Sequence, residues 1–183
     1  LDPYNGQVID LVNRLKTYRD SEGERAKVMG NLQKLEEDVA KNPTNYQAAF
    51  NLASTYVSMQ QTDRAIQILD RILNDPQVQP SAVLAIAQAY AQMNNLAKLE
   101  ATLERLVQIM PQEAEPHYDL AALKCGVGKL GDAMKSLTRA IEINMARRAT
   151  NASLRNLVDA TRADGRFAAL HSLPDYQKLV PPK

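Results

Sequence analysis

The chain has 183 residues, 45% of them hydrophobic and 23% charged, and its formal net charge is +1. This composition is that of an ordinary globular protein, and a charge so close to zero gives no electrostatic argument for an acidic or nucleic-acid partner. Because the sequence has no run of about 20 apolar residues, it offers no candidate membrane-spanning helix.

The first 43 residues predict a helix pair. One apolar stripe at helical spacing precedes residue 20, and a second follows residue 28. Between them, Ser21-Glu22-Gly23-Glu24 has the pattern of a capping box, which marks the start of a helix. We therefore expect residues 1–43 to form a degenerate helix pair that caps the N-terminal end. The two stripes are Val8, Leu11, Val12, Leu15 and Tyr18, then Met29, Leu32, Leu35 and Val39.

Three stretches then repeat at a period of 34 residues, in columns that align without gaps. Such a period is typical of a stacked repeat array, and these arrays usually serve as binding surfaces. Within each unit, steps of three and four between apolar residues predict two helices joined by a short polar turn. The units are residues 44–77, 78–111 and 112–145. Shared columns include Leu52, Ile86 and Leu120, then Ala53, Ala87 and Ala121, and further on Leu69, Leu103 and Leu137.

These columns resemble the tetratricopeptide repeat family. The matching residues are Leu52-Ala53 with Tyr56, Ile86-Ala87 with Tyr90, Leu120-Ala121, and the small residues Ala65 and Ala133 of the second helices. The resemblance implies an all-α, right-handed α-solenoid whose concave face is lined by the first helix of each unit. Two departures stand out. Leu99 occupies the column of Ala65 and Ala133, which predicts looser or shifted packing, and Lys124 replaces a tyrosine.

The opening Leu1-Asp2-Pro3 also resembles the end of a preceding repeat. We expect from this that the chain is a piece of a longer protein. The sequence does not indicate a cellular compartment.

Residues 146–183 are expected to form a helical C-terminal cap. Leu154, Leu157, Val158 and Thr161 predict an amphipathic helix that ends at Gly165, and two short helical turns follow on either side of Pro174. This segment should cover the open face of the last repeat, including Leu137 and Ile141. Its basic residues outnumber its acidic ones, so Arg147, Arg148 and Arg155 form a second candidate docking patch. Few aromatic residues lie among them, which does not favour nucleic-acid binding.

Catalytic chemistry has little support in the sequence, and no cofactor or metal site is indicated. Cys125 is the single cysteine, so the chain has no internal disulfide and no typical structural zinc site. His117 lies eight residues before Cys125 on one predicted helix, about 12 Å away by helical rise, which is too far for a nucleophile and its base. Both residues are expected to pack between helices, and Gly126-Val127-Gly128-Lys129 to form an inter-helix turn.

The candidate site is the concave face. Phe50, Leu84 and Tyr118 share one column and would form an apolar ladder, with polar neighbours that suit an extended or helical peptide. These neighbours are Asn51, Ser54, Gln88 and Asp119. The favoured function is a non-catalytic module that binds a protein or peptide partner in this groove. The alternative is a self-association module that builds a homo-oligomer.

Overall fold

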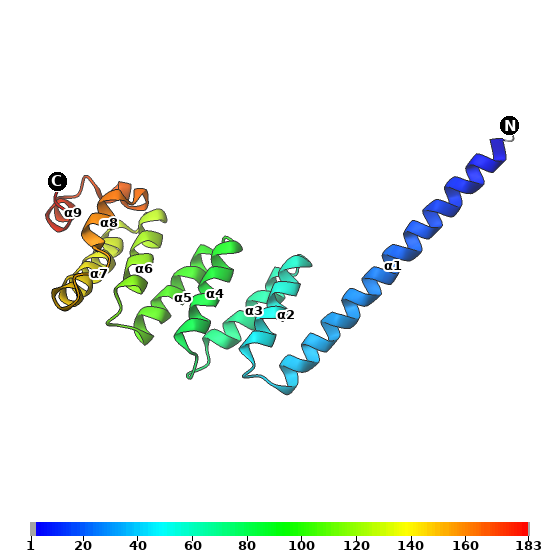
Figure 1. Cartoon of the computed structure of the whole chain (residues 1–183), viewed down its shortest axis with the longest axis horizontal. Coiled ribbons are helices and arrows are strands. Elements are labelled where there is room, and N and C mark those ends of the chain that lie inside the picture. Colours follow the sequence, from blue (N-terminus) through cyan, green and yellow to red (C-terminus); the bar gives the residue numbers. More distant parts are fainter. Residues whose placement is uncertain (1–2, 183) are drawn as a thin grey trace. The chain divides into compact units, whose positions relative to one another are not determined.

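The computed structural model describes the backbone of residues 3–182 and the side chains of residues 14, 16, 17 and 19–182. Every regular element in this part of the chain is a helix, as the sequence predicts (Figure 1). None of these helices is long and apolar enough to cross a membrane. The chain divides into two compact units, residues 1–72 and 73–183, which we describe in turn.

Unit 1 begins with one continuous helix, α1 (Pro3–Lys41), so the predicted pair of helices is wrong. Residues 21–24 lie inside α1 and start no new helix. The physical reason is that this stretch contains no proline, and one glycine costs a helix only about 1 kcal/mol. The predicted stripe from Val8 to Tyr18 lies outside the described side chains.

The last part of α1 packs on α2 (Tyr46–Ser58). Leu32 and Val39 are buried there, and the Tyr56 hydroxyl donates to the Glu36 carboxylate. Arg64, from α3 (Thr62–Leu73), places its guanidinium 5.4 Å from the centre of the Tyr56 ring. By contrast, the described side chains of α1 between residues 14 and 31 are all exposed.

The turn that joins the two helices of each pair has the same backbone geometry in all three pairs, at positions 34 residues apart. The second of its three residues lies in the left-handed region, with φ of 59° at Gln60, 52° at Asn94 and 80° at Gly128. The next amide then donates back to a carbonyl of the first helix, which closes the turn. These bonds run from Gln61 to Tyr56 at 2.8 Å, from Asn95 to Tyr90 at 2.9 Å, and from Lys129 to Lys124 at 2.8 Å.

Unit 2 contains two complete helix pairs, α4 (Pro80–Gln92) with α5 (Leu96–Ile109) and α6 (Ala114–Gly126) with α7 (Leu130–Thr150). The expected burial of the small columns is confirmed, because Ala87, Ala121 and Ala133 are all buried, as are Ala53 and Ala65 in unit 1. Small side chains there let paired helices approach closely. Residues 146–150 belong to α7 and not to the cap in which we expected them.

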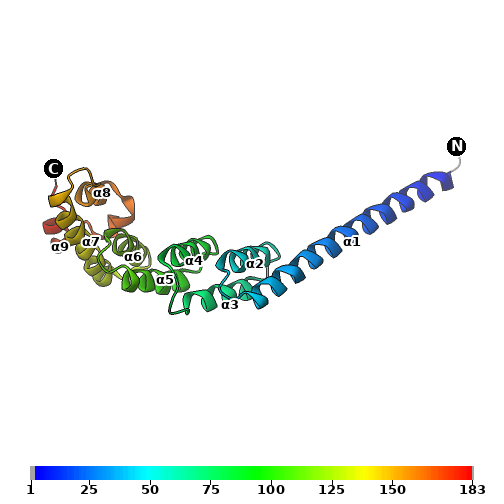
Figure 2. The same ribbon diagram turned by 60° about the horizontal axis from the view of Figure 1, so that its bottom comes forward.

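The C-terminal segment, residues 151–182, packs on α6 and α7, as predicted. It contains α8 (Leu157–Ala163), the 3-10 helix η1 (Gly165–Leu170) and α9 (Pro174–Leu179). Figure 2 shows these short helices beside α6 and α7. Leu157, Phe167 and Leu170 are fully buried in one core with Leu137 and Ile141. The segment therefore covers the last helix pair.

The shared turn geometry can be tested by substitution. Gly128→Ala should lower the free energy of unfolding by about 1 kcal/mol, because an alanine is strained in the left-handed region. No clash adds to this cost, since no atom lies within 4 Å of a Cβ placed at Gly128. Gln60→Gly should stabilise the protein for the opposite reason. Urea unfolding followed by circular dichroism measures both, and equal stability of all three proteins would contradict this account.

Candidate functional site

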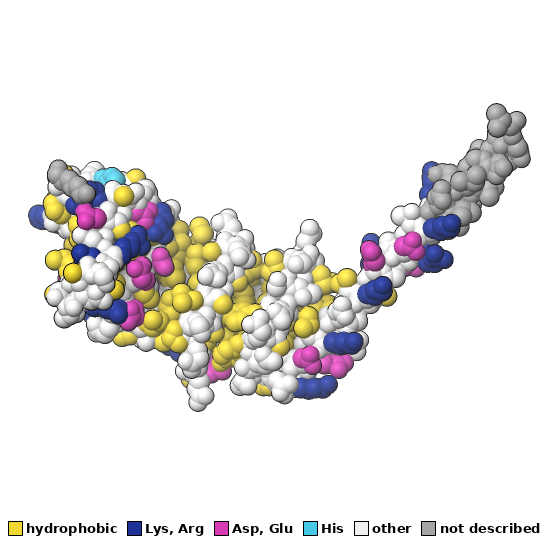
Figure 3. All heavy atoms as spheres, viewed as in Figure 1, with side chains coloured by type: hydrophobic (Ala, Val, Ile, Leu, Met, Phe, Trp, Pro, Cys, Tyr) yellow, Lys and Arg dark blue, Asp and Glu magenta, His cyan; other side chains and the backbone are white. Residues whose placement is uncertain are grey.

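A groove of about 550 Å³ crosses unit 2 over α4, α5 and α6, and we call it the α4–α6 groove. Ten of its lining residues are apolar or glycine, one is an amide, and the two charged ones meet at one end. Figure 3 shows apolar side chains gathered over these helices, with charged side chains beside them toward the end of the molecule that carries the C-terminus. The lining residues are Leu84, Ala87, Gln88, Ala91, Leu96, Leu99, Leu103, Asp119, Ala122, Leu123, Gly126, Val127 and Arg166.

Leucines form much of the groove surface. Leu84 on α4 and Leu96 at the start of α5 leave 42% and 43% of their surfaces exposed. Leu99 lies one turn after Leu96 and is half-buried, whereas Ala65 and Ala133 of the same column are fully buried. Replacement of the small residue by leucine therefore adds apolar surface to the groove, at the position where the sequence departs from its own repeat.

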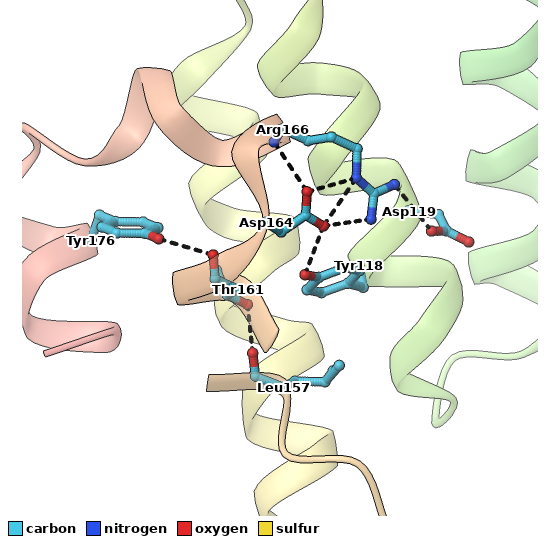
Figure 4. A network of polar contacts seen from close by, with 7 residues as sticks. All are labelled: Tyr118, Asp119, Leu157, Thr161, Asp164, Arg166 and Tyr176. Carbon is cyan, nitrogen blue, oxygen red and sulfur yellow. Dashed lines mark hydrogen bonds and ion pairs between the residues drawn. The ribbon is translucent and has the colours of Figure 1, made fainter. Parts of the chain in front are cut away.

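The charged end of the groove joins α6 to the C-terminal segment (Figure 4). Arg166, from η1, holds Asp164 through its Nε at 3.0 Å and its Nη2 at 2.7 Å. Its Nη1 faces Asp119 of α6 at 3.8 Å, which is an ion pair without a hydrogen bond. The groove thus receives its single cation from a segment that lies outside the helix pairs.

Tyr118 is not a groove residue, so this part of the predicted ladder is wrong. Only 1% of its surface is exposed, and its ring meets Phe167 edge to face with 5.1 Å between the ring centres. Two guanidinium groups, of Arg155 and Arg166, lie 5.5 Å and 5.6 Å from the Tyr118 ring centre. Burial raises the pKa of Tyr118. The ring is buried because the C-terminal segment covers it.

Asp164 lies at the centre of the polar contact between the C-terminal segment and α6. Its Oδ2 accepts a hydrogen bond from the Tyr118 hydroxyl at 3.0 Å, and its Oδ1 accepts one from the Arg166 amide, also at 3.0 Å. The hydrogen bonds from the Arg166 side chain lower the pKa of Asp164 to about 2. Asp164 therefore stays ionised at neutral pH and ties η1 to α6. On the far side of α8, Tyr176 donates to the Thr161 carbonyl at 3.4 Å.

The other predicted groove residues divide between the two units. Leu84, Gln88 and Asp119 do line the α4–α6 groove. In unit 1, Asn51 and Ser54 are exposed on α2 and Phe50 is half-buried. Because the two units are described separately, a ladder that continues from Leu84 to Phe50 stays a prediction.

The three arginines of the second candidate patch all contact groups of their own unit. Arg147 pairs with Glu113, and Arg148 donates to the Leu154 carbonyl. Arg155 lies over the Tyr118 ring, as described above. The Arg148 bond joins α7 to the C-terminal segment, whereas Arg147 and Arg155 make contacts at α6. A docking role for the three arginines stays a prediction.

Cys125 and His117 are both buried on α6. Cys125 is buried, and burial raises the pKa of its thiol, which disfavours the reactive thiolate. His117 is also buried, with its Nε2 at 3.2 Å from the Pro111 carbonyl. Among the described residues, no three of His, Cys, Asp or Glu gather in a way that could hold a metal ion.

A family model described as "Tetratricopeptide repeat" matches residues 32–82. The later helix pairs of unit 2 keep the same 34-residue period and turn geometry. Residues 32–82 are therefore similar to the tetratricopeptide repeat, a helical scaffold for protein interaction. No curated protein matches the chain.

Several solved structures are similar to this chain. "Crystal structure of MamA" is 16% identical, with a TM-score of 0.47, over 88% of this chain and 91% of that one. "MamA MSR-1 C2" is 20% identical, with a TM-score of 0.46, over 68% and 71%. "MamA RS-1 ArsTM double mutant" is 15% identical, with a TM-score of 0.47, over 69% and 70%.

Sequence reasoning missed Leu96, Leu99 and Arg166 as groove residues. A signal for Leu99 was present, because its departure from the alanine column was visible in the alignment of the repeats. Arg166 had no such signal. It is distant in sequence from α4 and α6, and only the packing of η1 on α6 brings it to the groove.

The Asp164 contact predicts a pH-dependent stability. Asp164→Asn should lower the free energy of unfolding at pH 7 by about 1 kcal/mol, since it weakens charge-assisted hydrogen bonds to a half-exposed arginine. The folded pKa lies below the ordinary value of about 3.9. The difference in unfolding free energy between wild type and variant should therefore have its full size at pH values above the ordinary pKa and should vanish as the pH falls through about 2.

Urea unfolding between pH 7 and pH 2 measures this difference. Asp175→Asn is the control, because Asp175 pairs with Lys178 within the same short helix and both side chains are highly exposed. The control should change stability by less than about 0.5 kcal/mol. A difference for Asp164→Asn that stays constant with pH would show that the Asp164 charge does not anchor the segment.

Proposed function

We propose that unit 2 binds an apolar segment of a partner protein in the α4–α6 groove. The observation that carries this proposal is the exposure of leucines inside a concave surface. Leu84 and Leu96 each leave more than two fifths of their surface open, and half-buried Leu99 lies with them. Apolar side chains that stay open to solvent in a groove are typical of a site for a protein partner.

The size of the groove supports a peptide segment as the bound group. About 550 Å³ accommodates a few large side chains, and the groove is lined by three helices that the repeat packing holds in place. Gln88 projects an exposed amide beside the leucines, and this amide can bond a peptide backbone. Apolar side chains of the partner would contact the leucines, while its backbone would meet the amide.

The proposal can be tested without knowing the natural partner. A display library of random 15-residue peptides is selected on the wild-type protein, and affinities of the enriched peptides are measured by fluorescence anisotropy. Leu84→Ser with Leu96→Ser should weaken the binding of these peptides about thirtyfold, because each leucine loses roughly 1 kcal/mol of apolar burial on binding. Both side chains are partly exposed, so the melting temperature should change little.

Met145→Ser is the matched control. Met145 is 60% exposed on α7 and does not line the groove, so its replacement should leave peptide affinity unchanged. Selection that enriches no peptide, or peptides that bind the double variant as tightly as wild type, would overturn the proposal. Light scattering over a dilution series then examines self-association, and a dimer lost in the double variant would assign the groove to a second copy of the chain.

A further inference from the structure

We propose that the groove selects a partner segment that carries a lysine or arginine among its apolar residues, and that Asp119 pairs with this cation. The inference rests on the proposed function, because it names the chemistry of the segment that the same groove would bind. It starts from the two charged residues of the groove lining, Asp119 and Arg166, which differ in how well their charges are already compensated.

The guanidinium of Arg166 is already paired with a carboxylate of the C-terminal segment. Its Nε and Nη2 donate to the Asp164 carboxylate, and the pKa of Asp164, lowered to about 2, keeps that carboxylate ionised. A side-on pair of this kind fixes the guanidinium in place and cancels most of its charge. Arg166 therefore has little charge left with which to attract an acidic segment.

Asp119 is poorly compensated by comparison. Among the described residues, its carboxylate makes one ion pair, at 3.8 Å to Arg166, and accepts no hydrogen bond. Burial of part of its side chain, more than any other cause, raises the pKa of Asp119, so its negative charge carries a desolvation cost when the groove is empty. A cation brought in by the partner would relieve that cost.

The charged groups around Asp119, taken together with Asp119 itself, carry a net negative charge. The groups that act on Asp119 are Arg166 and Arg155 on one side and Glu115 and Asp164 on the other. Three carboxylates, counting Asp119 itself, thus face two guanidinium groups. The rest of the groove lining is uncharged. Charge complementarity therefore calls for an apolar segment with one positive charge near the N-terminal half of α6.

The peptide selection described above can measure this preference. Peptides selected on wild type should be enriched in lysine or arginine beside apolar residues. Selection on Asp119→Asn should lose that enrichment, and selection on Asp119→Lys should replace it by aspartate or glutamate. Asp132→Asn is the control, because Asp132 is 53% exposed, close to the 49% of Asp119, and lies outside the groove.

Individual affinities make the test quantitative. Replacing the basic residue of a selected peptide by glutamine should weaken binding to wild type about two- to fivefold, the range for a partly exposed ion pair. The same replacement should not change binding to Asp119→Asn, because the pair is then already broken.

The possible failures are distinguishable. If peptides are enriched and depend on Leu84 and Leu96 but show no basic residue, the proposed function stands and this inference is wrong. An enrichment of acidic residues on wild type would also overturn it, and would assign recognition to Arg166. If selection enriches no peptide that depends on the groove leucines, both the proposed function and this inference fail.

Discussion

Close approach of paired helices is the constraint on which the rest of the structure depends. An alanine at a fixed column is buried in the first helix of every pair and in the second helix of two of the three pairs, and a left-handed residue turns the chain back at Gln60, Asn94 and Gly128. These two features fix the distance and the direction of the second helix relative to the first. Where the second column holds Leu99 in place of alanine, the larger side chain is only half-buried, and it lines the α4–α6 groove.

The C-terminal segment does more than cover apolar surface. Its core residues Leu157, Phe167 and Leu170 close the last helix pair, while Asp164 and Arg166 form a polar contact with α6. The same contact ends in the groove, because Arg166 faces Asp119. Removal of the segment would therefore expose the core of unit 2 and also change the charge at one end of the candidate site.

Tyr118 illustrates how a surface residue of the repeat pattern becomes a core residue. Its column is shared with Leu84, which is open to solvent in the groove, and nothing within a single repeat distinguishes the two positions. The difference in burial arises from the C-terminal segment, which covers one of the two residues. Leu84 has no such cover, whereas Tyr118 lies under Phe167 and beside two arginines.

The sequence by itself determined the all-α fold, the helix pairs and the burial of the alanine columns, because these depend on local spacing and on a period that repeats within the chain. It also placed Leu84, Gln88 and Asp119 in the groove lining. It failed at residues 21–24, since a capping pattern can also lie inside a continuous helix. Only the tertiary structure decided that Tyr118 is buried and that Arg166 reaches Asp119. Both depend on contacts between α6 and a segment more than forty residues later, and such contacts leave no periodic trace in the sequence.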